Sequence, residues 1–367
     1  MQKSMITLCG LLFGLMAAGC QKPVVEGPSH LIEPIDAHQL GYALTAARDL
    51  NIQPGRSIAH ITVHDGLVII VESPTNLVTA VSTRNGEVKW RQVVGHRAQR
   101  LFRPKSYEQQ ILINTQADLY LLSAETGEIQ QRQRLEALVS TAPAISDRLA
   151  IFGASDGLIF AHNARSGFSE WRRRLSDQIS AEPVEAFNFV FLTDEQGRGA
   201  MHATLNGDLI WNISFFGPVT VPAATNNLTL YVACEDTALY AISRQDGGRR
   251  WVHRTEHQLT QSPIVIGDLV YLNVPDVGMQ AIELDEPTVR WQFAERAQPV
   301  TLIGGRLLVN NTNQLLLLDT ETGRTFAQTP VQPLKTVLAL EAGRLLLISP
   351  TGRMLWLDPI HQTAQAQ

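Results

Sequence analysis

The sequence predicts an all-β protein, an eight-bladed β-propeller of four-stranded antiparallel blades closed by an N-terminal strand. Three observations predict this fold: a repeat of about 40 residues, short apolar runs without a helical period inside each repeat, and an incomplete last repeat. The chain has 367 residues, 44% of them hydrophobic and 18% charged, which is typical of a packed globular protein. Its net charge of -5 shows no basic surplus, so we expect no nucleic acid partner.

A glycine followed four residues later by a tryptophan marks the repeat. The first such pair is Gly86 and Trp90, and later copies have Trp171, Trp211, Trp251 and Trp291 at the tryptophan position. In the copy with Trp291, Pro287 stands in place of the glycine. Two more copies have Gln131 and Ala327 at the tryptophan position. A large ring at one fixed place in each blade suits docking on the neighbouring blade, and truncating it should cost about 3–5 kcal/mol. Trp356 falls outside this column, so we expect its truncation to cost less than that of Trp211.

Each copy contains four runs of strand length separated by turn residues. The runs are rich in Val, Ile, Leu and Tyr, as at residues 119–122 and 239–242, and they lack the 3.6-residue period of a helix. The middle runs are apolar on both faces, which is typical of a strand buried on both sides. The inner strands of a propeller blade have this environment, because each blade packs between two others.

The last copy requires a strand from elsewhere. Residues 344–358 stop before the fourth strand of the eighth blade, and residues 40–52 lie upstream of the first complete copy. A strand from 40–52 would pair the two ends of the chain and leave no open sheet edge at the seam. The Ala and Leu content of this segment also permits a short helix, but we expect the strand. The propeller should therefore occupy residues 38–358, with a C-terminal tail at 359–367.

The first 19 residues have the features of a secretory signal. Lys3 provides a positive start, residues 6–16 form an apolar run without charge, and small residues lead up to Cys20. The apolar run is too short to span a membrane comfortably. We therefore expect residues 1–19 to be a lipoprotein signal peptide that is removed from the mature protein.

The small residues before Cys20 resemble the lipobox of bacterial lipoproteins, although Ala17 stands where that motif usually has leucine. The resemblance implies a diacylglyceryl thioether on Cys20 and a fatty acid such as palmitate on its amine, with residues 20–37 as a lipidated tether. Two or more acyl chains anchor a protein stably. Gln21 after the cysteine implies sorting to the outer membrane, where the protein would face the periplasm. Ordinary cleavage that leaves a free Cys20 thiol is the alternative.

The whole repeat resembles the quinoprotein-type propeller repeat. Its marks are a small residue and a proline at the start of a copy, an apolar strand, Leu-Tyr-Ala-Ile at 239–242, a glycine turn and Trp251. Together with the lipobox, residues 40–358 resemble the BamB family of outer-membrane assembly lipoproteins. The resemblance implies a non-enzymatic periplasmic scaffold that supports insertion of β-barrel proteins into the outer membrane. Its implied partner is a BamA-type outer-membrane barrel with periplasmic domains.

One charged stretch suggests a partner-binding surface, and we assign it to Arg174, Leu175 and Asp177. The run Arg-Leu-Ser-Asp shortly before Pro183 resembles the inter-blade segment of BamB proteins that lies near their partner-binding surface. It combines charges with an apolar residue, which suits an interface. A connection at this place should lie on one rim of the propeller, free of core packing. A solvated charged connection without a binding role is the alternative.

We expect no catalytic residues, no metal and no cofactor. His162 and His202 occupy an otherwise apolar column, which favours core histidines over metal ligands because no third ligand follows. The acidic turn at 319–323 lacks the spacing of a calcium loop. Cys234 lies in an apolar run and should be a small buried hydrophobe. Two other functions stay open, namely an envelope propeller that binds another protein or a glycan, and a PQQ-dependent dehydrogenase. Dehydrogenases with this repeat have a vicinal cysteine pair, which this sequence lacks.

Overall fold

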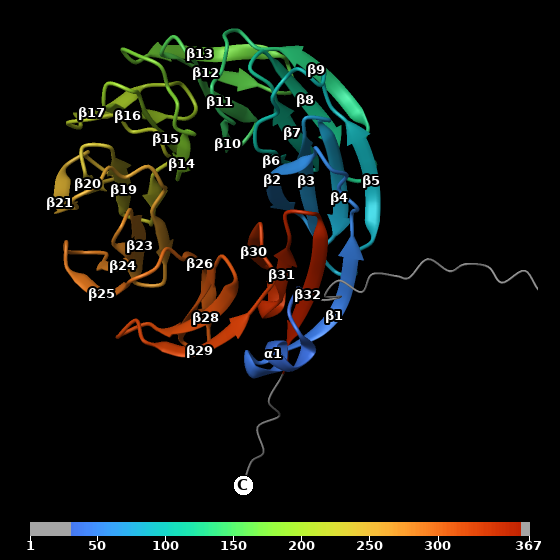
Figure 1. Ribbon diagram of the computed structural model, residues 1–367. Coiled ribbons are helices and arrows are strands. Elements are labelled where there is room, and N and C mark those ends of the chain that lie inside the picture. The colour runs from blue at the N-terminus through green and yellow to red at the C-terminus, as the bar shows by residue number, and fades with distance from the viewer. Residues whose placement is uncertain (1–30, 361–367) are drawn as a thin grey trace, which may run out of the picture.

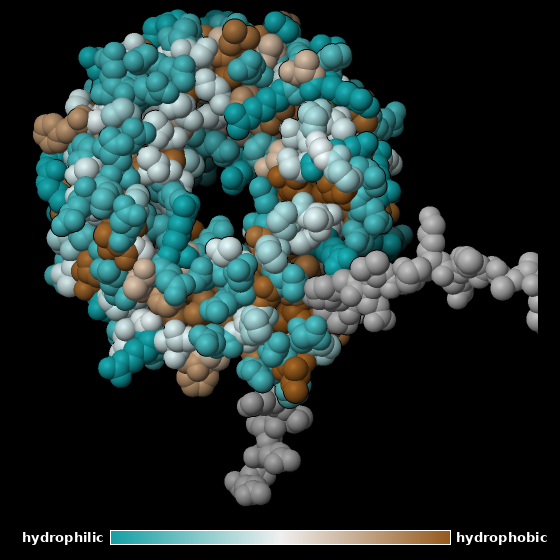
Figure 2. Space-filling model, viewed as in Figure 1, coloured by the Kyte–Doolittle hydropathy of each residue, from teal (hydrophilic) through white to brown (hydrophobic). Residues whose placement is uncertain are grey.

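The computed structural model describes residues 31–360, which form a ring of eight four-stranded sheets (Figure 1). This confirms the predicted eight-bladed propeller. The first strand of each blade lies toward the centre of the ring and the fourth lies outside (Figure 1), and the centre is open (Figure 2). Within this range the helical segments are α1 (Pro34–Gln39) and the 3-10 turn η1 (Glu341–Gly343).

Blades 1 to 7 each take four antiparallel strands from one continuous stretch of chain. In order they are β2 (Ser57–His64), β3 (Leu67–Ser73), β4 (Leu77–Ser82) and β5 (Val88–Val93); β6 (Lys105–Tyr107), β7 (Gln110–Asn114), β8 (Asp118–Ser123) and β9 (Ile129–Arg134); β10 (Ala144–Ser146), β11 (Leu149–Gly153), β12 (Leu158–Asn163) and β13 (Phe168–Arg174); β14 (Val184–Ala186), β15 (Phe189–Thr193), β16 (Arg198–Ala203) and β17 (Leu209–Ser214); β18 (Ala224–Thr225), β19 (Thr229–Cys234), β20 (Ala238–Ser243) and β21 (Arg249–Arg254); β22 (Ile264–Ile266), β23 (Leu269–Val274), β24 (Gly278–Glu283) and β25 (Val289–Phe293); β26 (Gln298–Ile303), β27 (Arg306–Asn311), β28 (Gln314–Asp319) and β29 (Thr325–Pro330).

Blade 8 is shared between the two ends of the propeller. It contains β30 (Thr336–Ala339), β31 (Leu345–Ile348) and β32 (Arg353–Pro359), and its fourth strand is β1 (Tyr42–Asp49). β1 pairs with β32 in antiparallel register. The N-terminal strand therefore closes the ring, as predicted. The alternative of a short helix in this segment is wrong, and the short α1 ends before β1 begins.

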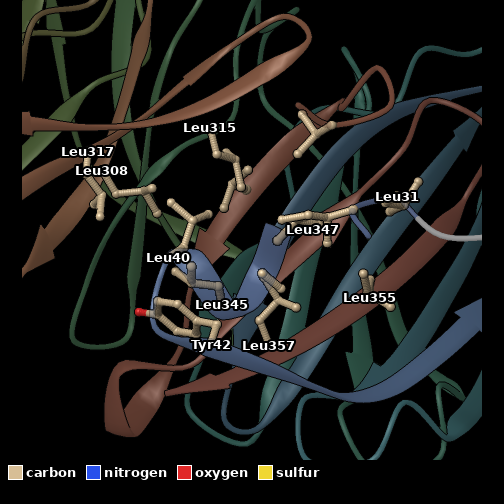
Figure 3. Close-up of a cluster of buried hydrophobic side chains, with 14 residues drawn as sticks. Leu31, Leu40, Tyr42, Leu308, Leu315, Leu317, Leu345, Leu347, Leu355 and Leu357 are labelled. Atoms are coloured by element: carbon tan, nitrogen blue, oxygen red, sulfur yellow. The ribbon is translucent and has the colours of Figure 1, made fainter. Parts of the chain in front are cut away.

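The segment before β1 packs on the propeller within the range that we expected to be a tether. Leu31, Ile32 and Ala37 are buried, and the carbonyl oxygen of Leu31 accepts the N–H of Gln332 at 2.8 Å. Figure 3 shows the cluster that they join, which draws on blades 7 and 8 through Leu308, Leu315, Leu317, Leu345, Leu347, Leu355 and Leu357. The folded body therefore includes residues 31–37.

A tryptophan in the fourth strand docks on the next blade at five of the eight interfaces. The indole Nε1 of Trp171 donates to the carbonyl oxygen of Thr204 at 2.8 Å, in the turn between the third and fourth strands of blade 4. Equivalent bonds join Trp90 to Ala124, Trp211 to Arg244, Trp251 to Leu284 and Trp291 to Thr320. The indole also lies against the turn glycine, since a Cβ at Gly207 would come within 2.5 Å of Trp171. Glycine is therefore needed there for close approach as well as for its φ of +71°.

Two interfaces without a tryptophan are closed by other groups. Between blades 2 and 3, the side-chain amide of Gln133 donates to the carbonyl oxygen of Ala164 at 2.6 Å, which is the acceptor position that the indoles use elsewhere. The Oε1 atom of Gln133 also hydrogen-bonds with Nε2 of the buried His162 at 2.6 Å. Between blades 7 and 8, Ala327 packs against the cluster that contains Ala37 of α1. The N-terminal segment therefore packs where a tryptophan would otherwise lie.

At the seam between blades 8 and 1 the tryptophan changes strand. Ala46 of β1 takes the fourth-strand position and pairs with Trp356 on β32, whereas in blade 3 the fourth-strand Trp171 pairs with Ala161. Trp356 is fully buried, and a Cβ at Gly86 would lie 2.9 Å from its ring. Our expectation that Trp356 lies outside the docking column was therefore wrong. Its indole Nε1 has no hydrogen-bond partner among the described residues.

The two kinds of indole site should respond differently to phenylalanine. Trp211→Phe removes the hydrogen bond to the Arg244 carbonyl oxygen, which should lower the free energy of unfolding by about 1–2 kcal/mol beyond the loss of ring area. Trp356→Phe removes a donor that has no partner, so this additional loss should be absent. Truncation to alanine should instead cost both sites about 3–5 kcal/mol. Urea denaturation of the four variants measures these differences, and a larger loss for Trp356→Phe than for Trp211→Phe would contradict them.

Candidate partner-binding rim

One rim of the propeller, here called the inter-blade rim, is built from two sets of loops. One set follows the fourth strands, and the other joins the second and third strands. In seven of the eight blades the N–H of the first residue after the fourth strand donates to the last residue of the second loop. These bonds join Leu175 to Gly157, Val94 to Asn76, Leu135 to Ala117, Phe215 to Gly197, Thr255 to Thr237, Val331 to Asn313, and Leu50 to Gly352. The rim loops are therefore held in place by the backbone.

The structure places Arg174, Leu175 and Asp177 together on this rim, between blades 3 and 4. Arg174 ends β13, and its guanidinium pairs with the Asp156 carboxylate at 3.0 Å, with both side chains 57% exposed. Leu175 is half-buried and packs on the cluster between the two blades. The Asp177 carboxylate accepts the N–H of Gln178 at 2.8 Å. Our expectation that the stretch is free of core packing was wrong for Leu175, which holds the loop on the propeller.

The ion pair on this loop is accessible to a partner. Burial alone would raise the pKa of Asp156, but the N–H of Leu158 and the Arg174 guanidinium outweigh it and hold the pKa below its usual value. The carboxylate is therefore ionised at neutral pH. An exposed pair of this kind contributes at most about 1 kcal/mol to stability. A binding partner can therefore take over Arg174 at little cost to the fold.

Hydrogen bonds connect this loop to both neighbouring parts of the rim. On the blade 2 side, the contact runs through the β11–β12 loop of blade 3, which the Leu175–Gly157 bond joins to this loop. In the β11–β12 loop, the N–H of Ser155 donates to the carbonyl oxygen of Leu138 at 2.9 Å. On the blade 4 side, the N–H of Ser176 donates to the Asp194 carboxylate at 3.1 Å, and the N–H of Phe215 donates to the Gly197 carbonyl oxygen at 2.7 Å. A continuous strip therefore runs over three successive inter-blade loops.

Two exposed apolar side chains flank the charged centre of this strip. Leu138 is 55% exposed in the loop between blades 2 and 3, and Phe216 is 76% exposed in the loop between blades 4 and 5. Sequence reasoning missed both residues. The available signal was a large apolar residue in a connection where polar side chains are usual. We define the rim strip as Leu138, Arg174, Leu175, Asp177 and Phe216.

The other residues singled out from the sequence lie away from the strip or outside the described range. Cys20 is outside the described residues, so its lipid stays a prediction. His202 Nδ1 hydrogen-bonds with the Gly207 carbonyl oxygen at 3.0 Å, and burial lowers the pKa of His202. Burial raises the pKa of the Cys234 thiol to about 12. The carboxylate of Asp319 accepts the N–H of Thr322 at 2.8 Å, as in an ordinary turn.

Residues 31–360 show no group of three or more His, Cys, Asp or Glu side chains arranged to hold a metal ion. In the same range no helix has the length and apolar character needed to cross a membrane.

A family model described as outer membrane protein assembly factor BamB matches residues 76–220 and 216–366. The chain belongs to the BamB family. Two curated relatives carry the same description. The one from Moranella endobia (strain PCIT) is 25% identical over 236 residues, which are 57% of this chain and 60% of that protein. The one from Yersinia pestis is 28% identical over 151 residues, which are 39% of this chain and 38% of that protein. The matches thus span less than two thirds of these BamB proteins.

Solved structures support the BamB-like architecture. The crystal structure of BamB from Moraxella catarrhalis has a TM-score of 0.69 at 16% identity, and the match covers 88% of this chain and 99% of that one. The computationally designed Ika8 protein has a TM-score of 0.70 at 10% identity and covers 86% and 99%. Sqt1 from Saccharomyces cerevisiae has a TM-score of 0.67 at 12% identity and covers 86% and 98%. At these identities the likeness shows the fold alone.

Single substitutions should show how much each residue of the rim strip contributes to stability. Arg174→Glu places a carboxylate opposite Asp156, and because both groups are exposed it should lower the free energy of unfolding by less than about 1 kcal/mol. Leu175→Ala removes a half-buried side chain and should cost about 1–2 kcal/mol, less than a fully buried leucine. Urea denaturation measures both. Equal stability of wild type and Leu175→Ala would show that this loop does not depend on the Leu175 contact.

Proposed function

We propose that this protein is a non-enzymatic envelope scaffold that supports the assembly and insertion of β-barrel proteins into the outer membrane. The observation that carries the proposal is the rim strip, a continuous charged and apolar surface on a propeller of the BamB family. The relatives that match are described as outer membrane protein assembly factors. A binding role requires a presented surface, and the rim strip provides one.

The composition of the rim strip suits protein recognition. Interfaces combine apolar anchors with charged groups, and a few residues supply most of the binding energy. Leu138 and Phe216 are the exposed anchors, and Arg174 is the exposed charge between them. Because backbone hydrogen bonds already hold these loops, binding would require little ordering of the chain.

We further propose that the partner is a BamA-type barrel with periplasmic domains, and that a lipid on Cys20 holds the protein at the outer membrane. The position of Leu31 supports this arrangement, because its carbonyl oxygen bonds Gln332 in the inter-blade loop between blades 7 and 8. The chain therefore joins the propeller at the rim that also carries the strip. Leu31 follows Cys20 by eleven positions, which span at most about 40 Å when extended. A lipid on Cys20 would keep this rim near the membrane.

A pull-down with charge reversals tests the proposed partner surface. Arg174→Glu combined with Asp177→Lys should lower recovery of the BamA-type barrel from solubilised membranes, since losing an interface anchor worth about 2 kcal/mol weakens binding roughly thirtyfold. The matched control is Glu295→Lys with Arg296→Glu, which lie on the same rim between blades 6 and 7. Thermal melting should be similar for both double variants. Equal barrel recovery from the two would reject the rim strip as the partner surface.

The anchor is tested by fractionation. Cys20→Ser removes the only sulfur that can carry the thioether under the lipobox resemblance, so the protein should move to the soluble envelope fraction. Two acyl chains bind a bilayer far more strongly than an exposed protein surface does. A variant that still sediments with membranes after a salt wash would show that something other than a lipid on Cys20 holds the protein there.

A further inference from the structure

The opposite rim carries an apolar cavity at the junction of blades 4 and 5. This rim, here called the turn rim, consists of the turns between first and second strands and between third and fourth strands. The cavity has a volume of about 190 Å³, and its lining includes Phe189, Ile210, Leu228, Arg244 and Arg250. Small-molecule sites usually measure roughly 300–1,000 Å³. The cavity is therefore small for such a ligand and close in size to one large side chain.

The other blades show that Phe187, which contacts the lining residue Arg244 without lining the cavity itself, is not required by the fold. Phe187 lies in the turn before the second strand of blade 4, with φ of +52° and 56% of its surface exposed. The same position, also at positive φ, holds Asp65, Glu108 and Asp147 in blades 1 to 3. A left-handed backbone disfavours a bulky residue. An exposed phenylalanine there serves neither the turn nor the core.

Arg244 is a second departure from the repeat, and it contacts the first. At its position, the start of the turn between third and fourth strands, the other blades have Thr83, Ala124, Ala164, Thr204, Leu284 and Thr320. The guanidinium carbon of Arg244 lies 4.6 Å from the centre of the Phe187 ring, within the range of a cation–π contact. Its Nε atom donates to the carbonyl oxygen of Asn227 at 2.9 Å. Arg244 is thus fixed over the ring at the lip of the cavity.

Two more cavity residues are apolar at positions that are mostly polar in the other blades. Leu228 is 63% exposed, and its position elsewhere holds Gly66, Gln109, Arg148, Asn188, Asp268 and Gly305. Ile210 is 43% exposed, and its position elsewhere holds Lys89, Gln130, Glu170, Arg250, Arg290 and, in blade 7, Phe326. Three departures from the repeat therefore line one cavity, and the fourth, Phe187, contacts one of them, Arg244. Phe187, Leu228 and Ile210 expose apolar surface to solvent.

We propose that this cavity, the blade 4–5 pocket, is a docking site for an extended peptide segment of a partner protein. The segment would place one large apolar side chain in the cavity and an acidic side chain on the arginines beside it. The site is independent of the rim strip and of the function proposed for it.

The charge at the lip of the pocket selects the acidic group. Within residues 31–360, neither Nη2 of Arg244 nor the guanidinium of Arg250 has a protein hydrogen bond or ion pair. The one acid on this turn, Asp246, accepts the N–H of Gly248 at 3.0 Å, and the Ser243 hydroxyl and, more weakly, the charge of Arg250 lower its pKa. Arg250 therefore has an acidic neighbour but makes no ion pair with it. A guanidinium fixed by an aromatic ring and a carbonyl presents its remaining N–H groups to a carboxylate with little loss of freedom. The pocket therefore favours an apolar side chain next to a carboxylate.

Saturation-transfer NMR on the full chain tests the pocket with a defined probe. The probe is the capped peptide acetyl-Gly-Asp-Phe-Asp-Gly-amide, and two matched peptides carry Ala for Phe or Asn for both Asp residues. We expect transfer to the phenyl protons of the probe and at least about tenfold weaker binding of each matched peptide.

The variants use residues that the repeat already accepts. Phe187→Asp and Arg244→Thr introduce the residues found in blade 1 at Asp65 and Thr83, so the fold should be kept. Phe187→Asp should melt no lower than wild type, because aspartate tolerates positive φ better than phenylalanine. Both variants should weaken binding of the probe at least about fivefold. The control is Phe326→Gln in blade 7, since Phe326 is also exposed and lies against an arginine, but its partner Arg306 does not line this pocket, whereas the Phe187 partner Arg244 does.

Three results would overturn the proposal. One is the absence of transfer to the probe, and another is unchanged binding by Phe187→Asp or by the alanine peptide. The third is self-association in sedimentation that Phe187→Asp abolishes, because the occupant would then be a second copy of this chain. Recovery of the barrel partner should be unchanged in Phe187→Asp, so failure at this pocket and failure at the rim strip can be told apart.

Discussion

The contact between consecutive blades is the interaction on which the ring depends. An indole N–H binds a turn carbonyl, and the ring packs on a turn glycine, so each blade is held by its neighbour. Two exceptions show that the hydrogen bond to the turn and the packing of the ring can occur separately. Gln133 keeps a hydrogen bond to the turn without the ring, and Trp356 keeps the ring without a hydrogen bond. Stability in such an array is a sum over neighbouring interfaces, so each one must be closed in some way.

The repeat explains why most of the fold could be predicted. Blade number and the closing strand depend on residues at fixed offsets, which a sequence displays directly. Trp356 was misjudged because spacing within the repeat predicts which strand carries a residue, but not where its side chain lies in the folded ring. The exchange of Trp356 and Ala46 across one strand pair returns the ring to the docking position from another strand. Only the pairing of β1 with β32 shows this.

The N-terminal segment illustrates a second limit. α1 has six residues, too few to show an amphipathic period, and isolated helices of this length are unstable. It is stabilised by burying Ala37 and Leu40 with leucines of blades 7 and 8. In the sequence, the only sign of this contact is that Ala327 replaces the tryptophan of the repeat. That replacement does not show which segment fills the space beside Ala327. Burial by a distant segment is a tertiary property that local pattern does not contain.

The candidate site residues were harder to predict from the sequence than the fold. Arg174 was proposed from a motif, whereas the exposed Phe216 and Phe187 were not singled out because exposure cannot be read from residue type. The repeat provides a remedy, since each column meets nearly the same backbone in every blade. When one blade has a residue that suits this backbone position less well than those in the other blades, the residue lowers stability and is not needed for the fold. At Phe187 the cause is a bulky side chain on a left-handed turn, in a column that holds acids in the three preceding blades. Its contact with Arg244, another departure, is the observation on which the proposed docking pocket rests.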